Sequence, residues 1–345
     1  MANEQPVKKF FSLQWHVTNA CDQRCKHCYI WTNSDQRRIT DEPDIKQCRY
    51  IIQQFDTFSR SLGAIPQFVI TGGDPLLYKH FWELIKIIRE YVDGFIILGN
   101  PFHLTPDVAK RLNEAGCTAY QMSIDGLEAT HDRLRNKGSF AATLQAIPIL
   151  QQANFRTMIM STVSLANYQE IPAVAQLCCK MKVTNFAFAR YCPTGSNGVA
   201  SISAQEYKEF LEEMWRVFEA NAKLGTRFSL KDHLWTAFLY EKGLLKLYKE
   251  KGIIYGGCNC GLRHLTLLPN GVVYACRRFI SPVGNIYNNT FSEIFFSSEM
   301  EHYREIEKLE GCKDCELLYY CRGCHAVAAG TTEDFFAKDP QCWKK

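Results

Sequence analysis

The stretch QFVITGGDPLLYKHFWELIKII, residues 67–88, contains one complete strand-and-helix unit. Residues 67–70 read as a short apolar strand that ends at a Thr-Gly-Gly turn. After the turn, Phe81, Leu84, Ile85 and Ile88 recur at the spacing of one helix face. The stretch therefore predicts a β-strand followed by an amphipathic helix.

The same unit recurs along the first two-thirds of the chain. Residues 11–18 alternate apolar and polar side chains, which indicates a strand, and a helix is expected over 45–62. Further strand and helix pairs are expected at 95–98 with 106–115, 119–124 with 140–153, 157–163 with 170–182, and 185–190 with 204–222. Six such units in succession predict an α/β fold with a parallel sheet and helical crossovers, either barrel-like or doubly wound.

This pattern breaks near residue 225. We expect a parallel α/β domain over 1–225, a bridge over 226–255 with a linker helix at 231–251, and a cysteine-rich domain over 256–345. Within that last domain, Pro-Asn-Gly at 269–271 stands between two apolar runs and predicts a hairpin. The rest of the domain has little regular pattern, so we expect it to bury little apolar core and to depend on metal.

Composition excludes several classes of protein. Hydrophobic residues make up 46% of the 345 residues and charged residues 22%, which is typical of a folded globular chain. The formal net charge of +4 gives no basis for nucleic-acid binding. No apolar run is long enough to span a membrane, and residues 1–9 lack the apolar stretch of a signal peptide. The expected location is therefore the cytoplasm.

Sixteen cysteines are too many to be incidental core residues. Without an export signal they are expected to be reduced, so clustered cysteines indicate metal binding or catalysis rather than disulfides. Cys21, Cys25 and Cys28 follow the first strand, at the edge where parallel α/β folds place their active sites. Three thiolates so close could hold three corners of an iron–sulfur cube and leave one iron open. A zinc site is the alternative, although zinc usually takes four ligands.

The C-x3-C-x2-C triplet, with His27 in an aromatic slot, resembles the signature of the radical S-adenosylmethionine (radical SAM) enzymes, whose fold is a partial (β/α)6 TIM barrel. Gly72-Gly73-Asp74 resembles the glycine-rich motif of that family, with Asp where Glu is commoner. The resemblance implies reductive cleavage of S-adenosylmethionine to a 5′-deoxyadenosyl radical that abstracts hydrogen from a C–H bond. It also implies a set of cofactor-binding residues: His27, Gly72, Gly73, Asp74, Ser123 and Arg135.

Eight cysteines between 258 and 342 are enough for two four-thiolate clusters. Their spacing resembles the SPASM domain, an auxiliary-cluster module of peptide and protein maturases. The resemblance implies one cluster on Cys258, Cys260, Cys276 and Cys324, and a second on Cys312, Cys315, Cys321 and Cys342. The last pair is C-x2-C where C-x3-C is usual. The tight Cys258-x-Cys260 spacing leaves open a first cluster that Cys258 does not bind and that keeps a vacant iron. Zinc knuckles are the alternative reading of Cys312 and Cys315.

Together the two resemblances imply an enzyme with S-adenosylmethionine and three [4Fe–4S] clusters, an oxidoreductase that modifies a ribosomal peptide or a protein side chain. The product would be a thioether or C–C cross-link, or an oxidised residue. A radical SAM enzyme acting on a tetrapyrrole or another small molecule, by haem-pathway decarboxylation or alcohol dehydrogenation, is the alternative. Outside enzymes, a zinc-stabilised binding protein is another.

The expected partners follow from the same resemblance. They are the peptide or protein substrate and a reductase, flavodoxin or ferredoxin as electron donor. A separate leader-recognition protein is also expected, because few residues precede the first strand. Neither nucleic acid nor a membrane is expected as a partner.

Asp232 and Cys192 stand outside these motifs at positions that bear on the chemistry. Asp232 corresponds, by position only, to an aspartate that takes a substrate proton in related sulfatase maturases, and a helix-capping carboxylate is the alternative. Cys192 follows the sixth expected strand and is interpreted as structural. The remaining cysteines are interpreted as buried apolar residues: Cys48, Cys117, Cys178 and Cys179.

Overall fold

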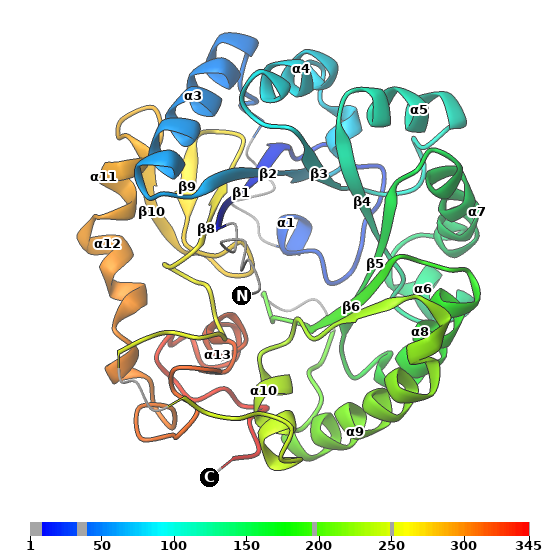
Figure 1. Cartoon of the computed structure of the whole chain (residues 1–345), viewed down its shortest axis with the longest axis vertical. Coiled ribbons are helices and arrows are strands. Elements are labelled where there is room, and N and C mark those ends of the chain that lie inside the picture. The colour runs from blue at the N-terminus through cyan, green and yellow to red at the C-terminus, as the bar shows by residue number, and fades with distance from the viewer. Residues whose placement is uncertain (1–8, 33–39, 195–198, 249–251, 345) are drawn as a thin grey trace, which may run out of the picture.

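The structure is a computed structural model that describes residues 9–32, 40–194, 199–248 and 252–344. Its centre is a ten-stranded sheet in the order β10-β9-β8-β1-β2-β3-β4-β5-β6-β7. The strands curve into an open ring, and α3, α4, α5, α7, α8 and α9 cover its outside (Figure 1). The predicted α/β fold with a partial barrel is confirmed.

The strands from β1 to β7 run parallel to their neighbours, and so do β1 and β8. The strands are β1 Phe10–Thr18, β2 Ile65–Gly72, β3 Phe95–Leu98, β4 Cys117–Ser123, β5 Arg156–Val163, β6 Asn185–Arg190, β7 Arg227–Ser229, β8 His264–Leu267, β9 Val272–Tyr274 and β10 Pro282–Asn285. The helices are α1 Tyr29–Thr32, α3 Ile45–Ser61, α4 Phe81–Tyr91, α5 Pro106–Glu114, α6 Glu128–Leu134, α7 Ser139–Gln152, α8 Ile171–Lys180, α9 Ala204–Asn221, α10 Leu234–Glu241, α11 Phe291–Phe295, α12 Ser298–Glu301 and α13 His325–Thr332.

All six predicted strand-and-helix units are present. Strand β1 is buried over most of its length because strands lie on both sides of it and helices cover the sheet. Helix α3 begins with a capping box between Asp44 and Gln47, which satisfies main-chain N–H groups that a helix start leaves without partners. Strand β7 was not predicted, because three residues are too few to show a period.

The cysteine-rich segment continues the same sheet. The predicted hairpin is formed by β8 and β9, and β8 pairs with β1, so that Leu265 lies opposite Leu13. Helix α11 packs on α3: the ring centroids of Phe291 and Phe55 are 5.4 Å apart, and Phe295 lies 5.2 Å from Phe11. The expectation that this segment buries little apolar core is therefore wrong. It adds its apolar side chains to the core of the barrel instead of building one of its own.

The predicted length of the linker helix, residues 231–251, is also wrong. Helix α10 ends at Glu241, and Gly243 two residues later has a φ of +70°, a left-handed conformation that stops a helix. Residues 249–251 lie outside the described residues.

A buried ion-pair network joins the barrel, the bridge and the C-terminal segment. Arg190 at the end of β6 donates from Nε to Asp232 at 3.0 Å. Its Nη1 and Nη2 donate to the two oxygens of Asp339 at 2.7 and 2.8 Å. All three side chains are almost fully buried, so the three parts of the chain are held together by charges that water does not reach. No helix in the described part of the chain has the length and apolar character to cross a membrane.

Candidate active site

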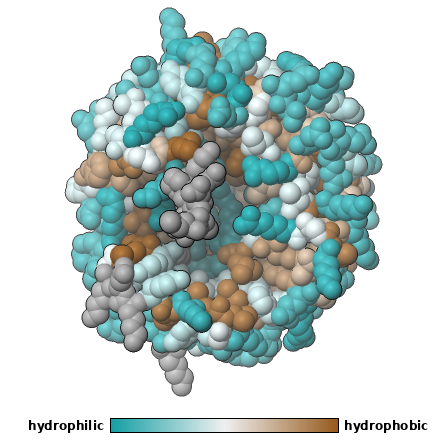
Figure 2. All heavy atoms as spheres, in the orientation of Figure 1, coloured by the Kyte–Doolittle hydropathy of each residue, from teal (hydrophilic) through white to brown (hydrophobic). Residues whose placement is uncertain are grey.

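A cavity of about 220 Å³ is lined by the carboxyl ends of the barrel strands, the Cys21–Cys28 loop and the loop after β9. This face of the molecule is hollowed near its centre (Figure 2). Side chains from the barrel and from the cysteine-rich segment therefore meet around one space.

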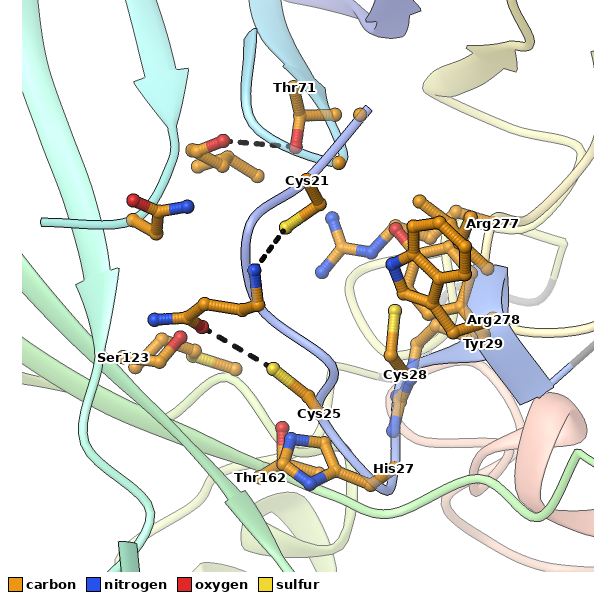
Figure 3. Close-up of a pocket in the computed structure, with 18 of the residues that line it drawn as sticks. Cys21, Cys25, His27, Cys28, Tyr29, Thr71, Ser123, Thr162, Arg277 and Arg278 are labelled. Atoms are coloured by element: carbon orange, nitrogen blue, oxygen red, sulfur yellow. Dashed lines mark hydrogen bonds between the residues drawn. The ribbon is translucent and has the colours of Figure 1, made fainter. Parts of the chain in front are cut away.

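The three cysteines of the first motif all line this cavity (Figure 3). Their loop is held by Gln23, whose main-chain N–H donates to Cys21 Sγ at 3.4 Å and whose side-chain oxygen accepts from Cys25 Sγ at 3.4 Å. Burial raises the pKa of Cys21 to about 11 and that of Cys25 to about 12. These three half-buried thiols become ligands only where a cation compensates the charge of their ionised form, which iron in a cluster would provide.

The spacing of the sulfur atoms separates the two kinds of metal site. A tetrahedral zinc ion binds sulfur at about 2.3 Å, which places its ligands about 3.8 Å from one another. Within the described residues, no three cysteine sulfur atoms lie within 4.8 Å of one another. The arrangement of the Cys21, Cys25 and Cys28 thiols therefore fits a cluster of several irons better than one zinc ion.

Asp125, two residues after the end of β4, organises one side of the cavity. Its Oδ2 accepts from Arg135 Nε at 2.5 Å and lies 3.2 Å from His27 Nε2, and its Oδ1 accepts from the main-chain N–H of Thr162 at 2.7 Å. Burial alone would raise the pKa of Asp125, but Arg135 and His27 outweigh it and hold the pKa well below the usual range. The carboxylate thus stays ionised, and Arg135 Nη1 lies 3.7 Å from Cys25 Sγ.

The sequence analysis assigned a role to Ser123 but none to Asp125, two residues later. An Asp-Gly pair after a strand has the composition of an ordinary turn. Only the fold shows that this carboxylate connects the two cofactor-binding residues predicted at positions 27 and 135.

Gly72 and Gly73 line the cavity where two segments of main chain touch. The N–H of Gly73 donates to the Thr18 carbonyl at 2.8 Å, and a Cβ on Gly73 would lie 2.1 Å from the Ala20 carbonyl oxygen. Gly72 has a φ of +139°, which favours glycine. Glycine is thus required at both positions because the main chain here packs directly against residues 18–20, which lead into the cysteine loop. This requirement adds to any contact with a cofactor.

Asp74 does not line the cavity. It caps the turn after Gly73 by accepting from the Leu76 N–H at 3.1 Å, and its carboxylate lies close to Asp22 and His103. Burial raises the pKa of Asp74 to about 7. Its predicted contact with the cofactor stays a prediction.

Ser123, at the end of β4, lines the cavity together with side chains that sequence reasoning missed. Tyr29, Arg277 and Arg278 come from α1 and from the loop after β9 (Figure 3). Four arginines line the cavity, Arg135, Arg190, Arg277 and Arg278, and none of its described lining residues is Asp or Glu. The cavity therefore favours an anionic group in the molecule that fills it.

Asp232 lies behind this wall. It does not line the cavity, it is paired with Arg190, and its Oδ1 accepts from the Leu234 N–H at 3.1 Å in the first turn of α10. Burial favours its neutral form, but the Arg190 guanidinium outweighs this and lowers the pKa of Asp232. These contacts stabilise the turn before α10, whose N-cap residue is His233, and the catalytic role of Asp232 stays a prediction.

The eight C-terminal cysteines fall into two spatial groups. Burial raises the pKa of Cys258 and Cys260, and Cys276 and Cys324 raise both further. Burial likewise raises the pKa of Cys312 and Cys321, and Cys342 raises both further. The first group is Cys258, Cys260, Cys276 and Cys324, and the second is Cys312, Cys315, Cys321 and Cys342. These are the two sets that the resemblance implied. The number of clusters they hold stays a prediction.

Comparison with known proteins agrees with this site. Residues 15–178 match the model of the Radical SAM superfamily, and residues 258–316 match SPASM, an iron–sulfur cluster-binding domain. An AdoMet-dependent heme synthase of Methanosarcina barkeri is 26% identical over 340 residues, which cover 96% of this chain and 95% of that protein. The mycofactocin maturase MftC of Mycolicibacterium smegmatis is 27% identical over 340 residues, 96% of this chain and 82% of that protein.

A solved structure supports the fold alone. Streptococcus suis SuiB bound to S-adenosylmethionine has a TM-score of 0.77 and 17% sequence identity, over 98% of this chain and 78% of that chain. At this identity the two proteins share their architecture, and the ligand named there belongs to SuiB.

Proposed function

This chain is a radical SAM enzyme with a SPASM domain, and from that premise we propose that it is a maturase of a ribosomal peptide or protein. It abstracts hydrogen from a side chain of its substrate and leaves a thioether or C–C cross-link, or an oxidised residue. One observation carries the proposal: a single cavity is lined both by Cys21, Cys25 and Cys28 and by Arg277 and Arg278 of the SPASM segment. A substrate bound there touches both parts of the chain.

The chain's own residues would act as follows. Cys21, Cys25 and Cys28 hold a [4Fe–4S] cluster, and Arg135, anchored by Asp125, offers its remaining donors to the carboxylate of S-adenosylmethionine. Bound together, these groups supply one-electron cleavage to a 5′-deoxyadenosyl radical that abstracts hydrogen. The wall of the cavity orients the substrate and excludes water. The eight C-terminal cysteines would hold two further clusters, three in all. These clusters would accept the electron that the substrate radical loses as the cross-link or oxidised residue forms, and the accompanying proton would leave to solvent.

The arginines of the cavity limit the chemical class of the substrate. Arg277 and Arg278 line the cavity and would favour a substrate that carries a carboxylate, and no described Asp or Glu on the cavity wall would repel that group. In a peptide this group is a C-terminal or side-chain carboxylate. The proposal includes a separate leader-recognition protein and a flavodoxin- or ferredoxin-type electron donor.

A second candidate is oxidation of a tetrapyrrole side chain. The same arginines would suit propionate groups, and relatives named as heme synthases align with almost the whole chain. We therefore keep haem-pathway decarboxylation as the alternative reaction.

The experiment offers both substrates to the anaerobically reconstituted enzyme with S-adenosylmethionine and dithionite. One arm contains synthetic peptides encoded by short reading frames next to the gene, and the other contains iron coproporphyrin III. A mass change in a peptide, with 5′-deoxyadenosine formed in step, supports the proposal, whereas loss of carbon dioxide from the porphyrin supports the alternative. As a control, the amidated form of the converted substrate should react poorly with the wild type, and Arg277→Gln should lose the preference for the free carboxylate. Absence of product in both arms would contradict both reactions.

A further inference from the structure

One cysteine that sequence reasoning set aside as structural lies among the proposed cluster ligands. Cys192 follows β6, so it belongs to the barrel, yet its thiol forms a hydrogen bond with that of Cys324. The two residues share a small buried cluster with Ala326 and Val327, and Cys276 packs against it. Cys192 also lines the large cavity, together with the three cysteines of the first motif.

We propose that Cys192 is a ligand of the first auxiliary cluster, supplied by the barrel and placed at the corner that faces the cavity. The inference rests on the proposed function, because that cluster is part of it. It adds a fifth thiol to a group for which the resemblance implied four. The ligands are then Cys192, Cys260, Cys276 and Cys324, and Cys258 is not required.

The choice between Cys192 and Cys258 follows from their positions. Only one residue separates Cys258 from Cys260, and both line a small cavity together with Tyr303 and Phe335. Cys192, in contrast, lines the active-site cavity. Cys192 comes from the barrel and packs in the same buried cluster as Cys324, so it offers a ligand that does not depend on the tight Cys258-x-Cys260 spacing.

The surroundings of Cys192 support a charged group at this corner. Arg278 lies beside both sulfurs: its Nη1 donates to Cys324 Sγ at 3.4 Å, and its Nη2 donates to the main-chain carbonyl of Arg190. A guanidinium held between two thiols offsets the negative charge of thiolate ligands. The same guanidinium lines the cavity, so this corner of the cluster would face bound substrate.

The test compares four forms of the full chain, reconstituted anaerobically: wild type, Cys192→Ala, Cys258→Ala and Cys178→Ala. Cys178 is the matched control, because it is a buried cysteine in the barrel core with no cluster nearby. Iron and sulfide are counted per chain, and electron paramagnetic resonance spectra are recorded in the oxidised and reduced states. Neither readout depends on turnover.

Loss of one ligand from a four-iron cube releases about one iron of roughly twelve and leaves a three-iron cluster with its own signal in the oxidised state. We expect this from Cys192→Ala alone, while Cys258→Ala and Cys178→Ala match the wild type. Cys192→Ser, which can still bind iron through oxygen, should keep its iron and shift the signal of the reduced cluster, even if the alanine variant folds poorly.

Two results would overturn the inference. If Cys192→Ala and Cys192→Ser keep the wild-type iron and spectra while Cys258→Ala forms the three-iron cluster, Cys258 is the ligand and Cys192 only forms a hydrogen bond. The proposed function then stands. If the wild type binds only the iron of one cube, the auxiliary-cluster part of the proposed function fails together with this inference.

Discussion

In the buried ion-pair network described above, Arg190 is the cation that contacts the carboxylates of Asp232 and Asp339. Replacing Arg190 with methionine removes that cation and leaves both carboxylates buried. Arg190 and both partners are almost fully buried, and three of its hydrogen bonds, 2.7 to 3.0 Å long, reach these two residues. Breaking a buried pair from one side lowers the free energy of unfolding by about 3–5 kcal/mol, because the other charge is left without a partner. At roughly 2 °C per kcal/mol for a chain of this size, the apparent melting temperature should fall by about 6–10 °C.

The assay is anaerobic thermal unfolding of reconstituted protein, with two comparisons. The triple variant Arg190→Met, Asp232→Asn, Asp339→Asn leaves no charge unpaired and should recover most of the loss. Arg49→Met breaks a pair with Glu90 that is half exposed and should leave the melting temperature at the wild-type value.

The dependence on pH gives a second check. Burial opposes ionisation of Asp232 and Asp339, but Arg190 outweighs burial and lowers the pKa of both carboxyls. The two ionised carboxylates therefore stabilise the fold at any pH above the ordinary carboxyl pKa of about 4. This stabilisation is lost as the pH falls through the lower folded-state pKa values. Without Arg190, burial raises these pKa values, and the carboxyls become neutral at a higher pH. The difference in melting temperature between wild type and Arg190→Met should therefore shrink as the pH falls from about 8 to about 5.5. A loss below about 2 °C at pH 8, or a triple variant as unstable as the single one, would refute the argument.

Three further changes test the site and the C-terminal segment. Asp125→Asn removes the charge that holds His27 and Arg135 in place. We expect the rate of 5′-deoxyadenosine formation, measured by chromatography, to fall about 10- to 100-fold. An unchanged rate would show that the carboxylate is dispensable. Gly73→Ala places a methyl group 2.1 Å from the Ala20 carbonyl oxygen, just before the cysteine loop. Because this displaces the loop, the purified protein should lose about one third of its iron. Full iron content would contradict the proposed crowding. Cys312→Ala with Cys315→Ala should lower the soluble yield and melting temperature and leave some 5′-deoxyadenosine formation without modified product by mass spectrometry; full product yield would return these cysteines to the zinc-knuckle reading.

Local patterns in the sequence were enough to predict the barrel. Each of the six units combines a short apolar strand with a helix whose apolar residues lie on one face, and these periods depend only on neighbours along the chain. The hairpin at 264–274 was predicted in the same way, from Pro-Asn-Gly between apolar runs. Its pairing with β1 was not, because strand order is set by contacts between residues about 250 positions apart.

In the candidate site, too, short-range sequence patterns were predictable and long-range contacts were not. The spacing of Cys21, Cys25 and Cys28 within eight residues was enough to predict a metal centre after β1. The roles of Asp125 and Cys192 depend on tertiary contacts, with Arg135 and His27 in one case and with Cys324 in the other. Neither residue has a neighbour in the sequence that would reveal such a contact.

The central claim is that Cys21, Cys25 and Cys28 hold the cluster that acts on S-adenosylmethionine, separately from the C-terminal cysteines. The most direct measurement replaces all three by alanine in the full chain and determines both the iron content and the 5′-deoxyadenosine formed under dithionite. We expect about two-thirds of the iron to remain and 5′-deoxyadenosine formation to be abolished, because the other ligands lie in a different part of the chain. A triple variant that still cleaves S-adenosylmethionine would contradict the assignment of the active cluster.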